Sequence, residues 1–222
     1  MSPRLQRRLW RHHLPLALLS AAAMAILYFT RPYPDVITRL SFASAWPALV
    51  LVTVTLLIGP WRILRGKAPV LSQDLRRDIG IWGGSLGVIH AVIGNCEHLR
   101  GRPWLYYVYE KMEEHLVPLR HDVFGFSNFT GLFAGLILLA LLATSNDAAL
   151  RKLGQPGWKS LQRWNYACFG LTALHTFGYV IGIQALKWGS IVTAALCVAI
   201  AALLQYQGWR RQTSLERTAD RR

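Results

Sequence analysis

Charged residues are scarce in this chain, and long polar stretches are scarcer still. Of its 222 residues, 16% are charged and 53% are hydrophobic, and apolar runs of nearly twenty residues recur along the whole length. No soluble domain, internal repeat or low-complexity tract interrupts them. Runs of this length allow a helix to cross a bilayer. We therefore expect an all-α integral membrane protein that is surrounded by the lipid bilayer.

Cysteines and phosphate-binding motifs are also lacking. The three cysteines, Cys96, Cys168 and Cys197, lie inside or at the edge of apolar segments and show no CxxC spacing. This pattern indicates neither a disulfide framework nor a zinc site. There is no glycine-rich phosphate loop, so no nucleotide-binding domain is predicted after the last span.

Acidic residues are outnumbered by basic ones, 11 against 25, which gives a net charge of +14. Nucleic-acid-binding proteins often carry such a charge, but here the basic residues form short clusters between the apolar runs. Clusters of that kind are typical of the cytoplasmic loops of membrane proteins. We therefore expect no nucleic-acid partner.

Hydropathy predicts a bundle of six transmembrane helices inside a domain that covers residues 13–206. The spans lie at about 13–30, 43–61, 79–97, 123–144, 161–184 and 187–206. The first run superficially resembles a signal peptide, but it is too long and has no clear cleavage site, so we expect it to be retained. Gly154, Pro156 and Gly157 predict a loop before the fifth span.

The distribution of Lys and Arg indicates the orientation of these spans. Eighteen of the 25 basic residues lie at the two termini and in the second and fourth loops, and seven lie on the other side. Cytoplasmic loops carry the excess of positive charge. The basic N-terminus (1–12), which includes His12 and His13, and the basic tail (207–222) are therefore both predicted to be cytoplasmic.

The longest external segment, residues 98–122, is too polar to cross the membrane. Its stretch YYVYEKMEEHLVPL has some helical periodicity, which favours a short helix at the outer surface, although a solvated loop fits equally well. An external iron site or a docking surface for a periplasmic partner could use the ionisable residues of this segment, and plain solvation is the alternative. These residues are His98, His115, His121, Glu113, Glu114 and Asp122.

Two of the seven histidines, His90 and His175, lie well inside predicted spans. His90 follows Arg77 by thirteen residues and His175 follows Arg163 by twelve. Each therefore lies about 18–20 Å above a cytoplasmic anchor, at 1.5 Å per residue. Because the third and fifth spans run in the same direction, the two imidazoles reach the same depth. Such a pair is suited to the axial ligation of one haem iron.

Small residues share the helix faces of both histidines, which leaves room for a porphyrin. They are Gly83, Gly87 and Gly94 beside His90, and Cys168, Gly178 and Gly182 beside His175. The alternative is that these residues allow close helix packing and that each histidine donates one hydrogen bond to a neighbouring carbonyl.

Two strings carry a family resemblance. LRRDIGIWGGSLGVIH (75–90) resembles the third helix of the ferric reductase-like transmembrane family, and TSNDAALRKLGQPGWKSLQRWNYACFGLTALH (144–175) resembles its fourth loop and fifth helix. The family includes haem-binding membrane subunits of the bacterial methionine sulfoxide reductase system, and the membrane halves of ferric-chelate reductases and NADPH oxidases. The likeness covers roughly residues 40–205.

The resemblance implies haem b between the third and fifth helices. Many family members hold two stacked haems, and their outer-haem ligands correspond to His90 and His175. Their inner-haem ligands correspond to about Arg76 and to Gln162, and neither is a histidine. The resemblance, with this departure, implies one haem b in the outer half of the bilayer.

A single outer haem leaves the cytoplasmic half of the membrane without a redox centre. The electron donor is then a quinol, a flavin at the cytoplasmic face or a separate reductase. Arg76, Arg77, Lys159 and Arg163 are candidates to hold an anionic headgroup or a flavin phosphate. The alternative is that they only anchor the helices on the positive side.

These observations predict a membrane-bound b-type cytochrome that passes single electrons to an acceptor at the outer face. It would serve as a ferric reductase-like oxidoreductase or as the haem subunit of a periplasmic reductase partner. Thr172, Asn95 and Tyr179 are candidates to fix the imidazole tautomers. The alternative is a haem-free scaffold or transporter in which His90 and His175 make proton or polar contacts.

Overall fold

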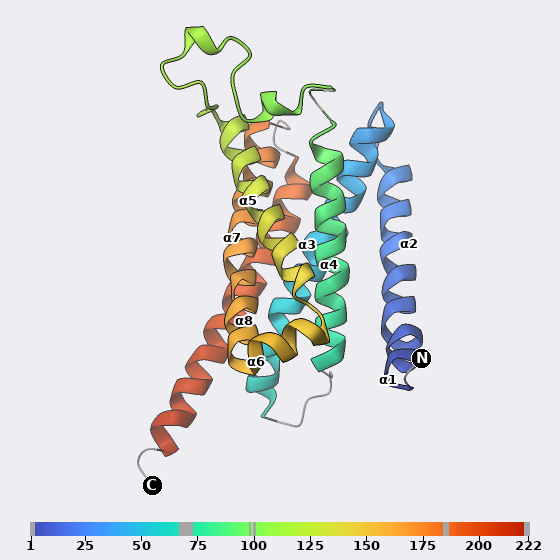
Figure 1. Cartoon of the computed structure of the whole chain (residues 1–222), viewed down its shortest axis with the longest axis vertical. Coiled ribbons are helices and arrows are strands. Elements are labelled where there is room, and N and C mark those ends of the chain that lie inside the picture. The colour runs from blue at the N-terminus through green and yellow to red at the C-terminus, as the bar shows by residue number, and fades with distance from the viewer. Residues whose placement is uncertain (1–2, 67–72, 98, 100, 184–186, 220–222) are drawn as a thin grey trace.

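The computed structural model is a bundle of long helices (Figure 1). It describes residues 3–66, 73–97, 99, 101–183 and 187–219. These parts of the chain contain no strand, and one isolated antiparallel bridge joins Val108 and Leu119. The predicted all-α class is confirmed.

The helical elements follow one another along the chain with short connections. In order, they are α1 (Pro3–Arg8), the π-helical turn η1 (Leu9–His13), α2 (Leu14–Thr30), α3 (Val36–Arg65), α4 (Gln73–Gly94), the 3₁₀ turns η2 (Pro103–Tyr106) and η3 (Met112–Glu114), α5 (Val123–Ala143), α6 (Asp147–Gln162), α7 (Trp164–Phe177), the π-helical turn η4 (Gly178–Ile183) and α8 (Trp188–Ala219).

Five helical stretches of the described chain are long and apolar enough to cross a membrane. They are Pro3–Thr30, Val36–Arg65, Val123–Ala143, Asp147–Ile183 and Trp188–Thr218. The predicted third span falls on α4, which is not one of them, because its first two turns read QDLRRD. Since α4 packs along both α3 and α5, it belongs to the bundle, and the count of six spans stays a prediction.

The helices extend beyond several predicted spans. α3 begins seven residues before the predicted span at 43–61, and α8 continues thirteen residues past the predicted end at 206. In place of the predicted loop before the fifth span, α6 consists of two helical segments that meet at a kink at Gly154, so the break is shorter than predicted. Gly154 has a positive φ of 67°, which only glycine adopts readily.

α3 lies at the centre of the bundle, in contact with α2, α4, α7 and α8. Two close approaches make this packing possible. A Cβ on Gly83 of α4 would lie 3.0 Å from Leu51 Cβ, and a Cβ on Gly208 of α8 would lie 2.7 Å from Pro60 Cβ. Small residues at helix crossings let membrane helices approach closely.

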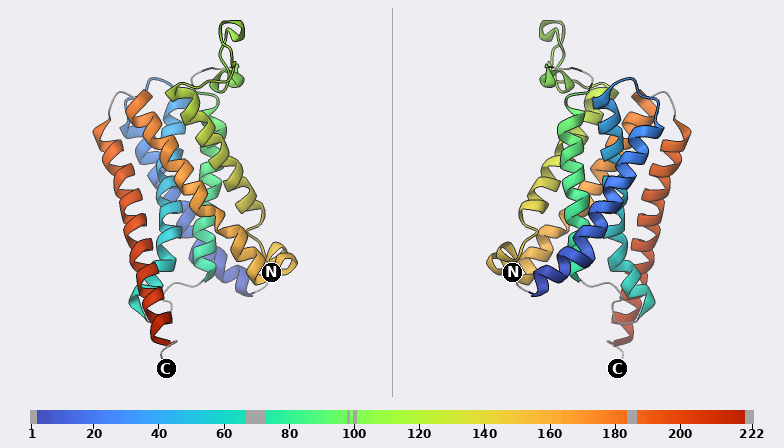
Figure 2. Two further views of the ribbon diagram at one scale, coloured as in Figure 1. Left: turned by 90° about the vertical axis from the view of Figure 1, so that its left-hand side faces the viewer. Right: turned by 90° about the vertical axis from the view of Figure 1, so that its right-hand side faces the viewer.

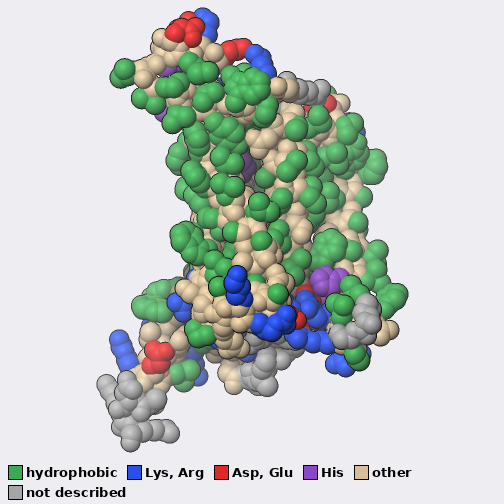
Figure 3. Space-filling model, in the orientation of Figure 1, with side chains coloured by type: hydrophobic (Ala, Val, Ile, Leu, Met, Phe, Trp, Pro, Cys, Tyr) green, Lys and Arg blue, Asp and Glu red, His purple; other side chains and the backbone are tan. Residues whose placement is uncertain are grey.

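The described chain begins and ends at the same end of the bundle, and the segment between α4 and α5 projects from the other end (Figures 1 and 2). Figure 3 shows apolar side chains over the middle of the bundle, and most of the Lys and Arg side chains in this view gather at the end that holds the termini. This distribution agrees with two termini on one side of a membrane. Which side they face stays a prediction.

The outer segment is not the short surface helix that its periodicity favoured. It forms the turns η2 and η3 and a narrow hairpin-like loop closed by the Val108–Leu119 bridge. Tyr109 donates its backbone N–H to Pro118 O at 2.9 Å, and Arg120 donates to Tyr107 O at 2.8 Å. These pairings satisfy backbone groups that a helix would have satisfied within itself.

Candidate functional site

The two histidines that the sequence places at one depth face each other in the structure. His90 lies on α4 and His175 on α7, and their ring centroids are 6.1 Å apart at an interplanar angle of 70°. A metal–imidazole bond is about 2.0 Å long, so two imidazoles on opposite sides of one metal have centroids about 6 Å apart. The spacing of His90 and His175 therefore fits a metal held between them.

Backbone carbonyls fix how the two rings are protonated. The Nδ1 atom of His90 lies 3.0 Å from Ser41 O on α3, and the Nδ1 atom of His175 lies 2.8 Å from Ser127 O on α5. A carbonyl can only accept, so each Nδ1 carries the proton. Each Nε2 is then left with its lone pair, which is the state that a metal-binding histidine needs.

None of the three residues expected to fix the tautomers contributes in that way. The Thr172 hydroxyl donates to Cys168 O, and Asn95 donates to Ala91 O. The Tyr179 ring does lie against His175, with centroids 4.9 Å apart, but its hydroxyl donates to Asn128.

A glycine on α5 makes room for the His175 imidazole. A Cβ on Gly131 would lie 2.5 Å from His175 Nδ1 and 2.8 Å from its Cε1. Two of the glycines predicted to leave room beside His90 instead pack against neighbouring helices. Gly83 and Gly87 allow helix packing, because a Cβ on Gly87 would lie 2.7 Å from Leu138 Cδ1. The alternative of close packing is therefore correct for these two residues.

The two positions that correspond to inner-haem ligands, Arg76 and Gln162, hold no histidine. Arg76 on α4 donates its Nε–H to Thr55 O of α3 at 3.2 Å. Gln162, the last residue of α6, has a buried Nε2 that no described residue accepts from. Arg77 is engaged with Asp147 at 2.6 Å, which joins α4 to α6. Arg77 therefore serves as a bridge between helices.

Known proteins resemble this chain over most of its length. The "protein-methionine-sulfoxide reductase heme-binding subunit MsrQ" of Pectobacterium atrosepticum is 32% identical over 165 residues, which cover 74% of this chain and 73% of the relative. The chain belongs to the MsrQ family. Proteins of the same name from Yersinia pseudotuberculosis and Yersinia pestis are each 29% identical over 161 residues, which cover 72% of this chain and 70% and 69% of the relatives.

No protein-family model and no solved structure matches this MsrQ-family chain. Its five apolar helical stretches and its bacterial relatives identify it as an integral protein of the inner membrane.

The outer loop of this MsrQ-family chain brings some of its predicted site residues together. The His115 ring stacks on Tyr109 at 3.7 Å, and the His115 and His121 centroids are 6.3 Å apart. Glu114 pairs with Lys111 at 2.6 Å. Glu113 is exposed, and His98 lies outside the described residues.

The described part of this MsrQ-family chain contains no group of three or more histidine, cysteine or acidic side chains that could hold a metal ion. Asp122 caps α5 by accepting from Gly125 N at 2.7 Å, and it pairs with Arg120. Asp122 therefore has a structural role at the start of α5.

Sequence reasoning missed a buried acidic site at the other end of α4. The Asp78 side chain is fully buried, and it accepts from Arg8, from His12 Nδ1 at 2.7 Å and from His13 Nε2 at 3.3 Å. His12 and His13 were assigned to a basic N-terminus. The signal that could have found this site is the aspartate that follows two arginines at the start of a span, because a buried carboxylate requires partners.

One turn earlier on α4, Asp74 pairs with Arg4 at 2.6 Å. The hydrogen bond from Arg4 is the main reason that the pKa of Asp74 lies below its ordinary value. The N-terminal arm, Pro3–His13, is thus fastened to α4 at two successive turns.

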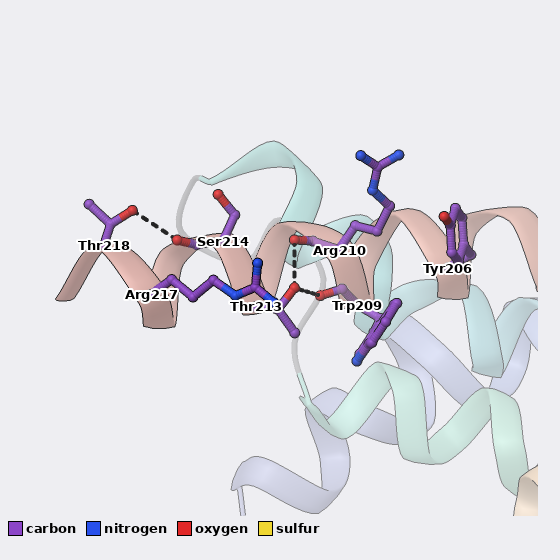
Figure 4. Close-up of a pocket in the computed structure, with 7 residues that line it drawn as sticks. All are labelled: Tyr206, Trp209, Arg210, Thr213, Ser214, Arg217 and Thr218. Atoms are coloured by element: carbon purple, nitrogen blue, oxygen red, sulfur yellow. Dashed lines mark hydrogen bonds between the residues drawn. The ribbon is translucent and has the colours of Figure 1, made fainter. Parts of the chain in front are cut away.

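A hollow of about 470 Å³ lies at the far end of α8, between Tyr206, Trp209 and Arg217 (Figure 4). Its Thr213 and Thr218 hydroxyls donate to carbonyls of their own helix. The hollow is open and its lining is largely exposed, so it lacks the buried polar groups that orient a ligand.

Proposed function

We propose that this chain is a membrane-bound b-type cytochrome that holds one haem between His90 and His175 and passes single electrons to an acceptor at the outer face of the inner membrane. The observation that supports it is the ring spacing of 6.1 Å combined with two Nε2 atoms left free by backbone hydrogen bonds. The relatives named as haem-binding subunits support the choice of haem over another metal.

Haem iron supplies reversible one-electron redox chemistry when it is bound. His90 and His175 would both hold the iron, and a haem held by two histidines favours electron transfer over oxygen binding. Ser41 O and Ser127 O hold the two rings in place, so the ligands need little rearrangement when the charge on the iron changes.

The position of the two histidines along the helices indicates from which side electrons would arrive and on which side they would leave. The two histidines lie in the half of the bundle nearer the outer loop, so an acceptor outside the membrane, such as a periplasmic reductase subunit, would receive the electrons. Neither Arg76 nor Gln162 supplies an imidazole for a second haem. The donor must therefore reach the haem from the other half as a quinol, a flavin at the cytoplasmic face or a separate reductase.

The test is an absorption spectrum with haem quantitation on the purified protein. We expect a Soret band and one haem per chain in the wild type, and loss of most haem in His90→Ala and in His175→Ala. His115→Ala, which removes a histidine from the outer loop, is the matched control and should keep its haem.

Two results would contradict the proposal in different ways. Two haems per chain would show that Arg76 and Gln162 do not prevent inner ligation. A haem-replete wild type without a Soret band would favour the haem-free scaffold or transporter.

A further inference from the structure

The N-terminal arm brings two consecutive histidines to one buried carboxylate. In an α-helix, neighbouring residues point about 100° apart. Here η1 is a wider π-helical turn, in which Leu14 N–H donates to Leu9 O, five residues back. Such turns occur frequently at functional sites. Because of the wider turn, His12 and His13 both contact Asp78 of α4.

The hydrogen bonds around Asp78 determine the tautomer of each histidine. Trp82 can only donate, and its Nε1 lies 3.2 Å from His13 Nδ1. His13 therefore carries its proton on Nε2 and donates from Nε2 toward Asp78. His12 donates from Nδ1 to Asp78 at 2.7 Å. Its Nε2 has no partner among the described residues, and 18% of its side chain is exposed.

A histidine held by a buried carboxylate through Nδ1, with Nε2 free, is arranged as a general base. Anchoring the arm does not need this arrangement, because Arg8 already donates to both oxygens of Asp78. His12, as a further partner of the Asp78 carboxylate, adds an imidazole that can accept a proton beside a fixed negative charge.

The surroundings of His12 indicate what kind of molecule gives up the proton. Leu9, Trp10 and Leu14 are 40%, 65% and 41% exposed, so exposed apolar side chains neighbour His12 in the sequence where the arm leads into the predicted first span. The arm also exposes Arg7 and Arg11. The apolar side chains fit a donor that is soluble in the membrane. Exposed Trp and Leu at such a boundary are typical of the membrane interface.

We propose that His12, held by Asp78, accepts the protons of a membrane-soluble hydroquinone that is oxidised at the cytoplasmic end of α4. The inference rests on the proposed function, which supplies a ferric haem as the oxidant. The inference names the residue that accepts the protons, a role that neither His90 nor His175 has in the proposed function. Asp78 is a positioning residue, and His12 is the residue that touches the substrate.

The reaction balances as follows. Oxidation of one hydroquinone breaks two O–H bonds and releases two protons and two electrons. Each electron reduces one ferric haem iron, which is reoxidised by the outer acceptor before the second arrives. The first proton goes to His12 Nε2 and leaves to water on the basic side, and the same nitrogen then accepts the second.

The charged groups at His12 and Asp78 come from the arm and the start of α4, and Asp147 of α6 lies 3.9 Å from Arg4. Arg8 and His13 come from the arm and Asp78 from α4, while Arg4 and Asp74 form the next pair. The neighbouring α2 has no charged residue.

The decisive variant is His12→Asn. Asparagine can still donate to Asp78 from its amide, so the anchor is kept, but it has no nitrogen that accepts a proton. His115→Asn, in the outer loop, is the matched control. One sample of each haem-loaded protein is reduced fully with dithionite, which shows that the haem site is intact. A separate, oxidised sample is mixed with decylubiquinol in a stopped-flow instrument.

We expect His12→Asn to slow haem reduction by decylubiquinol at least about 10-fold, because general bases contribute this much or more. His115→Asn should keep the wild-type rate. A smaller drop in His12→Asn with intact haem overturns the inference.

Binding is measured separately on haem-free protein, which cannot oxidise the ligand. Anaerobic titration with decylubiquinol should quench tryptophan fluorescence in a saturable way, and His12→Asn should weaken the Kd by at least about 3-fold, as loss of one hydrogen bond predicts. Equal affinities overturn the inference.

Three further outcomes separate the inference from the proposed function. If the wild type has no Soret band, the proposed function fails and the binding titration alone decides the inference. If His12→Asn does not fold, His12→Gln, which also keeps an amide donor and has no nitrogen that accepts a proton, is measured in its place, and a wild-type rate overturns the inference. If reduced flavin mononucleotide drives a His12-dependent reduction and decylubiquinol does not, the donor is water-soluble and the inference is wrong.

Discussion

Gly131 of α5 lies directly against the imidazole of His175 of α7, so close that a Cβ would be 2.5 Å from Nδ1. That same Nδ1 donates to Ser127 O, one helical turn away on α5. One face of α5 thus provides both the space for the ring and the acceptor that sets its tautomer. The position of His175 depends on a helix that carries no ligand.

The first prediction concerns this contact. Gly131→Ala should force the His175 ring to move and should lower the affinity for haem about 5-fold to 100-fold, since overpacking a buried site typically costs 1–3 kcal/mol. The ratio of haem to protein after purification measures it. Gly135→Ala is the control, because its Cβ would lie 3.6 Å from Ala91 Cβ, an ordinary contact. Equal haem loss in both variants would contradict the argument.

The second prediction concerns Asp78. Asp78→Ala leaves Arg8 without its buried carboxylate partner, which typically costs 3–5 kcal/mol and should lower the melting temperature by about 5–15 °C. Asp74→Ala removes a more exposed pair and should change it little. Thermal unfolding in detergent measures both. A similar small change in the two variants would show that the buried cluster does not stabilise the arm.

The third prediction is a pH dependence at the outer end. The hydrogen bond from Arg120 is the main reason that the pKa of Asp122 lies below its ordinary value. A lowered folded-state pKa gives stability that is present above the unfolded value, near 3.9, and is lost as pH falls through the folded value. Asp122→Ala should therefore melt a few degrees lower at pH 7, with the gap closing below about pH 4.

Glu113→Ala is the control for this pH dependence, because Glu113 lies on the exposed outer loop. Its melting temperature should follow the wild type at every pH. A gap between Asp122→Ala and the wild type that stays constant down to pH 3 would show that the carboxylate charge does not matter there.

The fourth prediction uses a natural probe of orientation. Cys96 is exposed just beyond α4, at the end of the bundle opposite the termini, whereas Cys168 is buried. A membrane-impermeant maleimide added to intact spheroplasts should label the wild type and should not label Cys96→Ser. Labelling that requires inverted vesicles would place the termini outside the cytoplasm.

The sequence was sufficient for the pairing of His90 and His175, for a physical reason. Helical rise is constant, so depth can be counted from a charged anchor, and two spans of the same direction bring equal depths together. Gly131, Ser41 and Ser127 could not be found in this way. They act from other helices, and every residue offers a backbone carbonyl, so no residue type indicates which carbonyls will be used.

Other errors arose where local patterns competed with long-range contacts. The outer segment has a helical period, but Val108 pairs with Leu119 and its backbone is satisfied across the loop. The Asp78 site was missed because a π-helical turn changes which side chains share a face. Gly154, Pro156 and Gly157 predict a loop, but a single residue with positive φ, Gly154, is enough to separate two helical segments.

The charged start of α4 also has a consequence for biosynthesis. A segment that begins QDLRRD enters a bilayer poorly by itself, because four charged residues in its first two turns lower its mean hydropathy. When this segment leaves the ribosome, the N-terminal arm with Arg4 and Arg8 has already been made, while Asp147 has not. The arm is therefore available to Asp74 and Asp78 before α5 to α8 have been made, so these two contacts can join α4 to the arm early in synthesis.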